Sequence, residues 1–283
     1  MQPLVIGSTT IDLIEYPGSH FSKIGGVTTY AGFTFKKLGL QPTVVSSFPS
    51  TDDRLNSVFE ENDIDRYVQD APESTRFINI YQGHTRIQKV LTLADPISLK
   101  PLKHIMQAKG HVHLGPLHPI DIEPVDLPLL GGAEYFLSLD VQGYTRKIEG
   151  EKIYPAVSKL LDSVLPNVHV LKADTDELTL VLKHFACSIP ELIHQFKLDE
   201  LIVTGAASGG CVYGAEGDVV QYRPREVLSH AETTGAGDVF FAAYLAARFY
   251  QKQARSAAVN QAVSLTETFI QGGLIETIAL TLN

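Results

Sequence analysis

Cysteine is scarce in this chain. Only Cys187 and Cys211 occur among 283 residues, and they do not form a CxxC motif. Two such cysteines exclude a disulfide framework and suit a reducing cytosol. Runs of Lys and Arg are also missing, and the formal net charge is −9. A nucleic-acid-binding protein would show a basic face, so we expect no nucleic-acid partner.

Long apolar runs and two common phosphate-binding motifs are absent as well. No stretch approaches the roughly 18 consecutive apolar residues that a membrane span requires, so we expect no membrane association. The N-terminal sequence MQPLVIGSTTIDLIE lacks a basic start and a long apolar run. This argues against a signal peptide and favours a cytoplasmic protein. Without GxxxxGK[ST] the chain is not a P-loop enzyme, and without GxGxxG after a strand a dinucleotide site has no support.

Short apolar runs alternate with helical patterns along the whole chain. This alternation predicts an α/β fold with a central, mainly parallel sheet. No low-complexity linker interrupts the pattern, so we expect one domain spanning residues 1–283. The expected strands are Leu4–Gly7, Thr43–Ser47, His111–Leu114, Tyr135–Leu139, Val168–Leu171 and Leu201–Thr204. The expected helices are Thr28–Leu38, Arg54–Glu61, Ile153–Leu165, Asp176–Phe185, Ala236–Gln251 and Ser256–Gln271.

Some extended segments fit the parallel sheet poorly. Thr9–Glu15 is one, and Thr75–Tyr81 with Thr85–Leu93 forms a hairpin pattern through Gln82-Gly83-His84. One interpretation is a lid over a ligand crevice, formed by about 9–16 and 75–95. The other is a set of edge strands of the main sheet, and the pattern does not separate the two.

The stretch TTGAGD at 233–238 precedes a nearly all-apolar helix. The first N–H groups of a helix have no intrahelical partner, and the helix dipole adds about half a positive charge there. Glycines allow an anion to approach the backbone, so the pattern predicts a phosphate site. The carboxylate of Asp238 then suits a base that takes the proton of a hydroxyl during phosphoryl transfer. The alternative is an acid that complements the helix dipole after a tight turn.

The sequence ETTGAGDVFFAAYL resembles the C-terminal signature of the ribokinase-like PfkB carbohydrate kinase family. IGGVTTYAGFTFKKLGLQPTVVSSF is similar to the family's N-terminal signature, and GSTTIDLIE to its opening strand. The resemblance implies a ribokinase-like three-layer α/β/α sandwich with a small β lid, and a kinase that uses ATP and Mg²⁺. It implies Asp238 as the catalytic base, and Gly235, Ala236 and Gly237 as the anion hole. It also implies Gly25, Gly26 and Asp12 as acceptor-binding residues, whose simpler alternatives are a tight turn and the outward face of a strand.

The sequence LKADTDEL occupies the place of the family's Asn-x-x-Glu motif. Asp174 stands where asparagine is usual, and Glu177 is retained. The resemblance implies that the pair organises magnesium, largely through water, which suits hard oxygen ligands. The alternative is a helix-capping pair, and both functions are compatible. Glu232 likewise replaces the first aspartate of the C-terminal signature.

Nucleotide-binding residues follow from the same resemblance. VTGAASGGCVYG is similar to the strand–turn–strand that lines the nucleotide, and AVNQAVSLTETFIQGG to the helix that flanks the base. The implied residues are Thr204, Gly205, Gly209, Thr234 and Asn260. Outside the family, VTGAASGGCVYG is only a Gly/Ser-rich hairpin.

Strand ends supply further candidate substrate contacts. Ligands of α/β sheets bind beyond the carboxyl ends of the strands, which points to His113 and to Asp140 and Gln142 of SLDVQG. A strand-terminal turn is the alternative. Metal binding by HVHLGPLH is disfavoured, because no nearby Cys or carboxylate completes a site.

The segments TRFINIYQGHTRIQKVLTLADPI and LSLDVQGYTR look like a PfkB subgroup that includes myo-inositol kinases. We therefore expect a kinase for a small sugar or polyol, with a possible homodimer through the lid. The alternatives are a nucleoside kinase of the same fold and a non-catalytic ligand-sensing relative.

Overall fold

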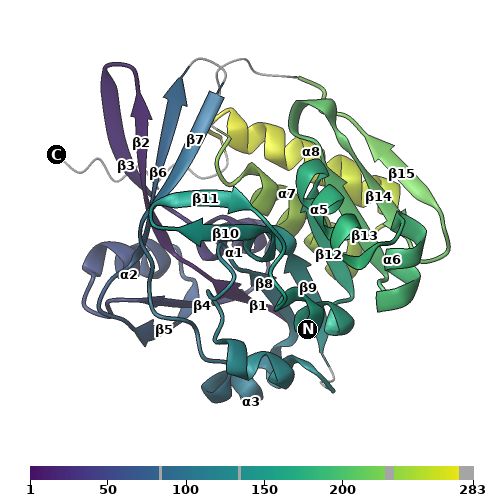
Figure 1. Ribbon diagram of the computed structural model, residues 1–283, viewed down its shortest axis with the longest axis horizontal. Helices are drawn as coiled ribbons and strands as arrows, with labels where there is room; N and C mark the ends of the chain where they lie inside the picture. Colours follow the sequence, from purple (N-terminus) through teal and green to yellow (C-terminus); the bar gives the residue numbers. More distant parts are fainter. Residues whose placement is uncertain (83–84, 133–134, 227–232, 274–283) are drawn as a thin grey trace.

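A nine-stranded sheet forms the centre of the molecule (Figure 1). The computed structural model describes residues 1–82, 85–132, 135–226 and 233–273. The strand order is β15-β14-β13-β12-β9-β8-β1-β4-β5, and all neighbours from β13 to β5 are parallel. The strands are β1 (Gln2–Gly7), β4 (Thr43–Phe48), β5 (Asp65–Asp70), β8 (Gly110–Gly115), β9 (Phe136–Asp140), β12 (Val170–Asp174), β13 (Glu200–Thr204), β14 (Gly210–Gly214) and β15 (Val219–Tyr222).

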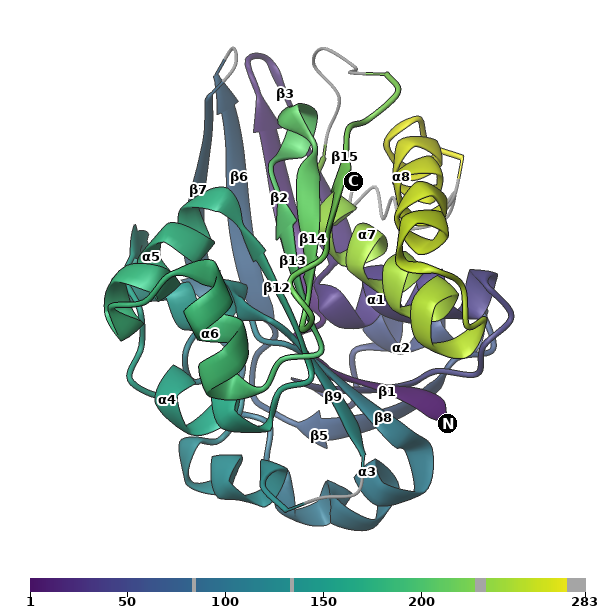
Figure 2. The same cartoon turned by 90° about the vertical axis from the view of Figure 1, so that its right-hand side faces the viewer.

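Helices cover both faces of this sheet (Figure 2). Each face packs on its own cluster of buried apolar side chains. One face carries α1 (Val27–Lys37), α2 (Asp53–Glu60), α7 (Ala236–Leu245) and α8 (Arg255–Ile270). The other carries α3 (Lys103–Lys109), α4 (Leu161–Val164), α5 (Thr175–Phe185) and α6 (Ile189–Phe196). The predicted three-layer α/β/α fold is confirmed. In the described part of the chain, no helix has the length and apolarity to cross a bilayer.

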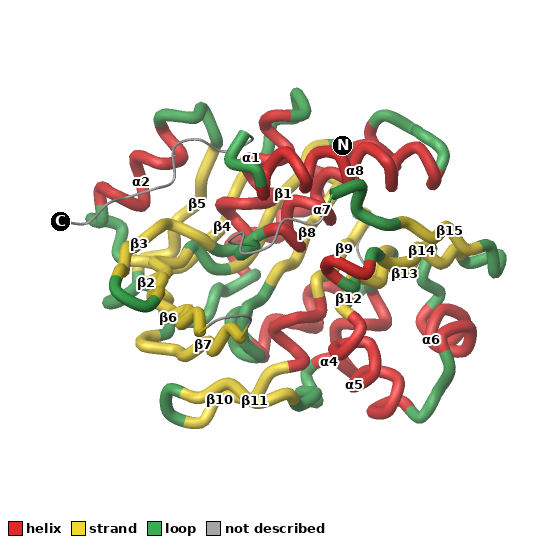
Figure 3. The backbone as a smooth tube through the Cα atoms, turned by 90° about the horizontal axis from the view of Figure 1, so that it is seen from above, coloured by secondary structure: helices red, strands yellow, loops and turns green. Residues whose placement is uncertain are grey.

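A second, six-stranded sheet stands off the edge of this body (Figures 1 and 3). Its order is β10-β11-β7-β6-β2-β3, with β2 and β6 parallel and the other neighbours antiparallel. We call this sheet the lid. It contains β2 (Thr10–Tyr16), β3 (Ser19–Gly25), β6 (Thr75–Gln82), β7 (Thr85–Thr92), β10 (Arg146–Glu149) and β11 (Lys152–Pro155). The hairpin tip at Gly83 and His84 lies outside the described residues, as does Glu232.

The helix predicted over 153–165 is wrong. Lys152–Pro155 is strand β11, and only the short helix α4 forms further on. Pro155 disfavours a helical conformation at Tyr154, and Gly150 makes the turn from β10 with a φ of 60°. The lid therefore contains two strands that were not predicted: β10, and β11, most of which was predicted as helix.

The helix predicted over 236–251 is divided. It is α-helical to Leu245 and continues as one π-helical turn, Ala246–Tyr250. Val239 to Ala247 are fully or almost fully buried, as expected for a helix that is apolar on nearly every side.

Candidate active site

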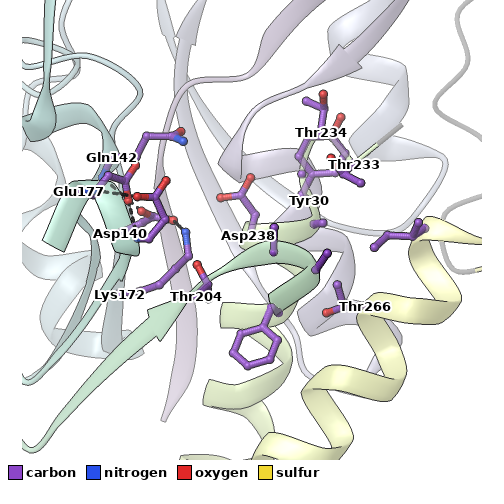
Figure 4. Close-up of a pocket in the computed structure, with 18 of the residues that line it drawn as sticks. Tyr30, Asp140, Gln142, Lys172, Glu177, Thr204, Thr233, Thr234, Asp238 and Thr266 are labelled. Carbon is purple, nitrogen blue, oxygen red and sulfur yellow. Dashed lines mark hydrogen bonds and ion pairs between the residues drawn. The ribbon is translucent and has the colours of Figure 1, made fainter. Parts of the chain in front are cut away.

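A cavity of about 380 Å³ lies where the carboxyl ends of the central strands meet the lid, the start of α7 and one side of α8. Asp140, Asp174 and Thr204 end three neighbouring parallel strands, β9, β12 and β13, so their side chains reach one edge. Figure 4 shows Asp238 between the cluster around Lys172 and the threonines before α7. The predicted residues that line the cavity are Asp12, Gly26, Asp140, Gln142, Asp174, Glu177, Thr204, Thr234, Gly235, Ala236, Gly237 and Asp238.

The start of α7 depends on a left-handed turn. Gly235 has a φ of 88°, and a Cβ at this position would lie 2.5 Å from the ring of Tyr30. The Ala236 N–H donates to the Thr233 carbonyl at 3.0 Å, closing the turn before the helix. Of the three predicted anion-hole amides, that of Ala236 is thus used internally. The N–H of Gly237 belongs to the first turn, where the helix provides no acceptor.

Asp238 lies in this first turn, and its partly buried side chain faces the cavity. Loss of hydration and the nearby carboxylate of Asp140 raise the pKa of Asp238. Lys172 and Arg146 act in the opposite direction but do not cancel the effect. An aspartate with a raised pKa is a better proton acceptor than an exposed one.

Lys172, which was not among the predicted site residues, occupies the centre of the cluster. Its Nζ forms an ion pair with Asp140 Oδ2 at 2.6 Å, and its side chain is only 6% exposed. The same Nζ lies 3.1 Å from the position that a Cβ on Gly237 would take. Burial alone would lower the pKa of Lys172, but Asp140, Glu177 and Asp238 outweigh it and raise the pKa. The cavity therefore has a permanent cation beside the start of α7.

A signal for Lys172 is present in the sequence. It interrupts the strand VLKAD between Leu171 and Ala173, both fully buried. A lysine in a strand of a sheet covered on both faces must be paired with an acid, because an unpaired buried charge is very costly. That reasoning would have identified a charged cluster at the end of β12, although not its partner.

Asp174 and Glu177 form the capping box of α5. Asp174 Oδ1 accepts from the Glu177 N–H at 2.7 Å, and Glu177 Oε2 accepts from the Asp174 N–H at 2.8 Å. Burial raises the pKa of Glu177, with Lys172 opposing and Asp140 and Asp174 adding to the shift. In each carboxylate, one oxygen accepts a capping hydrogen bond and the other oxygen takes no part in the capping box. The capping interpretation is confirmed, and it remains compatible with a metal bound through water.

The lid brings Asp12 to the cavity from β2. Asp12 is 3% exposed, and its carboxylate lies against Gly25 on the neighbouring strand, where a Cβ would approach Oδ2 to 2.6 Å. Gly26 has a φ of 86°, and its backbone passes so close to the Ser8 carbonyl that a Cβ would lie 2.1 Å away. Gly26 lines the cavity, whereas Gly25 makes room for Asp12 without lining it.

Other lid residues line the same space. Phe77 of β6, Gln88 of β7 and Arg146 of β10 do so, and none of them was predicted as a site residue. The guanidinium of Arg146 also donates to the Leu117 carbonyl at 3.2 Å. These positions become neighbours only when the lid strands pair, so spacing along the chain gives no sign of them.

The residues predicted to bind the nucleotide are only partly brought together at the cavity. Thr204 and Thr234 line the cavity, but Gly205 and Gly209 do not. A hydrogen bond closes the turn after β13: the Gly205 N–H donates to the Gly209 carbonyl at 2.6 Å. Ala206 and Ala207 within that turn face the cavity instead.

Asn260 is exposed on α8 and lies outside the cavity lining. The lining residues of this helix come one to three turns later: Val263, Thr266, Glu267, Ile270 and, just past its end, Gln271. The carboxylate of Glu267 accepts from the N–H groups of Arg225 and Glu226, which ties the segment after β15 to α8.

His113 does not contact the cavity. Strand β8 continues to Gly115, so His113 lies within the strand and not at its end. It is fully buried under α7, with Nδ1 2.9 Å from Ser138 Oγ and its ring 5.0 Å from that of Phe241. Burial lowers its pKa to about 4, which keeps the imidazole neutral.

The cavity is strongly acidic. Among the residues that the structure describes, seven carboxylates line it, from Asp12, Asp140, Asp174, Glu177, Glu226, Asp238 and Glu267, against the cations of Arg146 and Lys172. An anionic phosphate donor therefore needs additional positive charge. Among the described residues, no three His, Cys, Asp or Glu side chains are grouped to hold a metal ion. This donor set fits Mg²⁺, which commonly binds one or two carboxylates and completes its shell with phosphate oxygens and water.

Comparisons with known proteins identify the family of the chain. The chain matches the family model described as pfkB family carbohydrate kinase over residues 3–265. A search of curated protein sequences finds no match.

Solved structures share the fold across almost the whole chain. A pyrophosphate-dependent kinase of the ribokinase family has 24% identity and a TM-score of 0.83, covering 95% of both chains. The Methanocaldococcus jannaschii nucleoside kinase has 16% identity and a TM-score of 0.75, covering 99% of this chain and 95% of its own. The Arabidopsis thaliana ribokinase, solved with ribose and ATP, has 16% identity and a TM-score of 0.72, covering 98% and 95%.

Proposed function

Because the chain belongs to the pfkB family of carbohydrate kinases, whose members are phosphotransferases with hydroxyl acceptors, we propose that it transfers the γ-phosphoryl group of ATP to a small sugar or polyol. We take myo-inositol as the first candidate acceptor and the cytoplasm as the location. The observation that carries the proposal is the position of Asp238. It faces one cavity together with the first turn of α7, Lys172 and the lid carboxylate of Asp12.

Asp238 acts as the base in this proposal. Its carboxylate takes the hydroxyl proton as the acceptor oxygen forms a bond to the γ-phosphorus. The bond from that phosphorus to the bridging oxygen breaks, and ADP leaves. In this proposal the amide of Gly237 and the ammonium of Lys172, which lie close together, stabilise the negative charge on the phosphoryl group.

Asp174 and Glu177 would hold magnesium through the carboxylate oxygens outside the capping box. Bound there, the ion would supply positive charge to the donor phosphates, beside the cations of Lys172 and Arg146. The side of the cavity formed by Thr204, Thr234 and α8 would take the rest of the donor.

The acceptor end suits a molecule with several hydroxyls. It combines the carboxylates of Asp12 and Asp140, the amides of Gln88 and Gln142, and the guanidinium of Arg146. Carboxylates accept hydrogen bonds from hydroxyls, guanidinium groups donate them, and amides do both. A dense set of such groups favours a polyol or sugar as the acceptor. A nucleoside kinase is the alternative of the same class, and a non-catalytic ligand sensor is the alternative of another class.

Pyrophosphate is a second candidate donor. Three structural neighbours with TM-scores from 0.81 to 0.83 are described as pyrophosphate-dependent, one of them in complex with myo-inositol. Both donors end in the phosphoryl group that the start of α7 and Lys172 would bind, so this part of the cavity does not separate them.

A matrix of donors and acceptors tests the proposal. Purified enzyme with Mg²⁺ is given ATP or pyrophosphate, each with myo-inositol, ribose, fructose or cytidine, and the phosphorylated product is quantified. Asp238→Asn is the control for contaminating kinases. Transfer to cytidine alone would favour the nucleoside kinase. Binding of donor without transfer to any acceptor would favour the sensor.

A further inference from the structure

Three lid strands present side chains to one another across the inner face of the lid. Asp12 of β2 pairs in register with Phe77 of β6, and Asn79 of β6 pairs with Gln88 of β7. Phe77 and Asn79 are almost fully buried, while Ile78 between them is partly exposed, so the inner face is the one that carries Phe77 and Asn79. Of this set, Asp12, Phe77 and Gln88 line the cavity.

Gln88 is held in place by a buried partner. Its Nε2 donates to Asn79 Oδ1 at 3.0 Å, and Asn79 is fully buried. An amide that uses one N–H in this way keeps a second N–H and a carbonyl oxygen for other partners. Gln88 thus offers the cavity both a donor and an acceptor in a fixed orientation, which is suited to recognising a hydroxyl.

A polyol with several similar hydroxyls can enter a site in several orientations. The proposed base, Asp238, and Asp140 are on the body, and Asp12 and Arg146 come from the lid strands β2 and β10. The mirror-related hydroxyls of a symmetric polyol such as myo-inositol can be told apart only by a chiral site with at least three contacts. Gln88 adds to these groups a contact from β7 whose orientation is set by a second, buried side chain.

We propose that Gln88, positioned by Asn79, determines which hydroxyl of the acceptor is presented to Asp238. This inference rests on the proposed kinase function and adds its regioselectivity. A related solved structure, at 22% identity and a TM-score of 0.81, concerns the conversion of a myo-inositol-1 kinase into a myo-inositol-3 kinase by a double substitution. In a protein of this fold, therefore, very few side chains can decide the hydroxyl that reacts.

The test compares Gln88→Leu with the wild-type enzyme, using myo-inositol and the donor that the wild type uses. Phosphorus NMR and chiral chromatography of the product identify the phosphorylated hydroxyl. We expect the variant to form a mixture of regioisomers or the mirror-image product. The KM for the acceptor should rise about tenfold, the usual effect of one lost hydrogen bond.

Lys89→Leu is the matched control, since Lys89 is the next residue of β7 and its side chain is 40% exposed, in an ion pair with Glu151. It should leave product and KM unchanged. Gln88→Glu, which keeps the length of the side chain but accepts only, is the second variant and should also change the isomer ratio. A Gln88→Leu enzyme with the wild-type product and KM would overturn this inference alone. A wild-type enzyme that phosphorylates no polyol or sugar would overturn the proposed function.

Discussion

At the scale of single residues, the site depends on how three carboxylates share one ammonium group. Asp140, Glu177 and Asp238 all raise the pKa of Lys172, and Asp174 lies beside Glu177 in the capping box. In this crowded arrangement Asp238 holds a proton more firmly than an exposed aspartate. The charge state of Asp238 is therefore a property of the cluster.

Replacing Asp238 by Asn removes the proposed base but keeps the shape of the side chain. We expect kcat to fall by roughly two to four orders of magnitude, the usual contribution of a general base. Donor affinity, measured by calorimetry, should change little, because the amides and Lys172 remain. Turnover within tenfold of wild type would contradict the role of Asp238.

The pH dependence of the wild-type enzyme follows from the same cluster. Burial and neighbouring carboxylates raise the pKa of Asp238 to about 7. The base must be deprotonated, so kcat/KM should rise with pH and level off above this value.

Lys172→Met provides a matched comparison. It removes the cation that lowers the pKa of Asp238, so the rise of kcat/KM should move to higher pH. The exposed Lys37→Met serves as the control and should leave the profile in place. An identical profile for Lys172→Met would show that Lys172 does not act on the base.

At the scale of elements, the start of α7 is held by a turn that only glycine fits. Gly235→Ala would place a methyl group in a left-handed conformation and 2.5 Å from the ring of Tyr30. Gly217→Ala is the matched control, because Gly217 has nearly the same φ, 86° against 88°, with no atom within 4 Å of the added methyl.

The control should lose about 1 kcal/mol of unfolding free energy through backbone strain. Gly235→Ala should lose clearly more, and its activity should fall at least tenfold because the turn must move. Urea denaturation and the kinase assay together measure both effects. Equal losses in the two variants would show that contact with Tyr30 is unimportant.

Much of the structure at the start of α7 was predictable from the sequence. ETTGAGDVFFAAYL indicated the turn, the buried helix and a carboxylate in its first turn, because these are local properties of consecutive residues. The capping pair Asp174 and Glu177 was predictable for the same reason. Asn260 was placed on the correct helix, but the lining residues lie later in α8, since periodicity does not say where along its length a helix meets a cavity.

Contacts made by distant segments could not be predicted in this way. Gln88 and Arg146 reach the cavity only because β7 and β10 belong to the lid. Strand β10 was not predicted, and most of β11 was predicted as the start of a helix. His113 was expected at a strand end, but its strand continues for two more residues. Register and strand ends depend on the pairing of the whole sheet.

At the scale of the molecule, the outer face of the lid exposes apolar side chains. Ile87, Leu91 and Tyr154 are 43%, 40% and 40% exposed. Lys152 pairs with Lys89, so Tyr154 and Ile87 lie on the same side of the antiparallel β7–β11 pair.

Because exposed apolar groups on one face favour association, we expect a homodimer through the lid. Light scattering across a concentration series should detect the dimer. Ile87→Asp should shift the mass to that of a monomer, whereas Val125→Asp, at a site 71% exposed on the body, should not. A monomer at all concentrations would refute the dimer.

Buried histidines should make the whole fold sensitive to acid. Burial lowers the pKa of His113 to about 4 and that of His111 well below its usual value. The unfolded chain, with ordinary histidine pKa values near 6.5, binds protons that the folded chain does not. The contribution of these histidines to the unfolding free energy is therefore complete above about pH 6.5 and falls as the pH drops, by about 1.4 kcal/mol per pH unit for each such histidine.

His113→Asn tests this. Between pH 6 and pH 4.5 it should reduce the slope of the unfolding free energy against pH, measured by urea unfolding, by the amount that corresponds to about one proton. The exposed His20→Asn should leave the slope unchanged. Equal slopes for His113→Asn and wild type would mean that the imidazole gains its proton without unfolding.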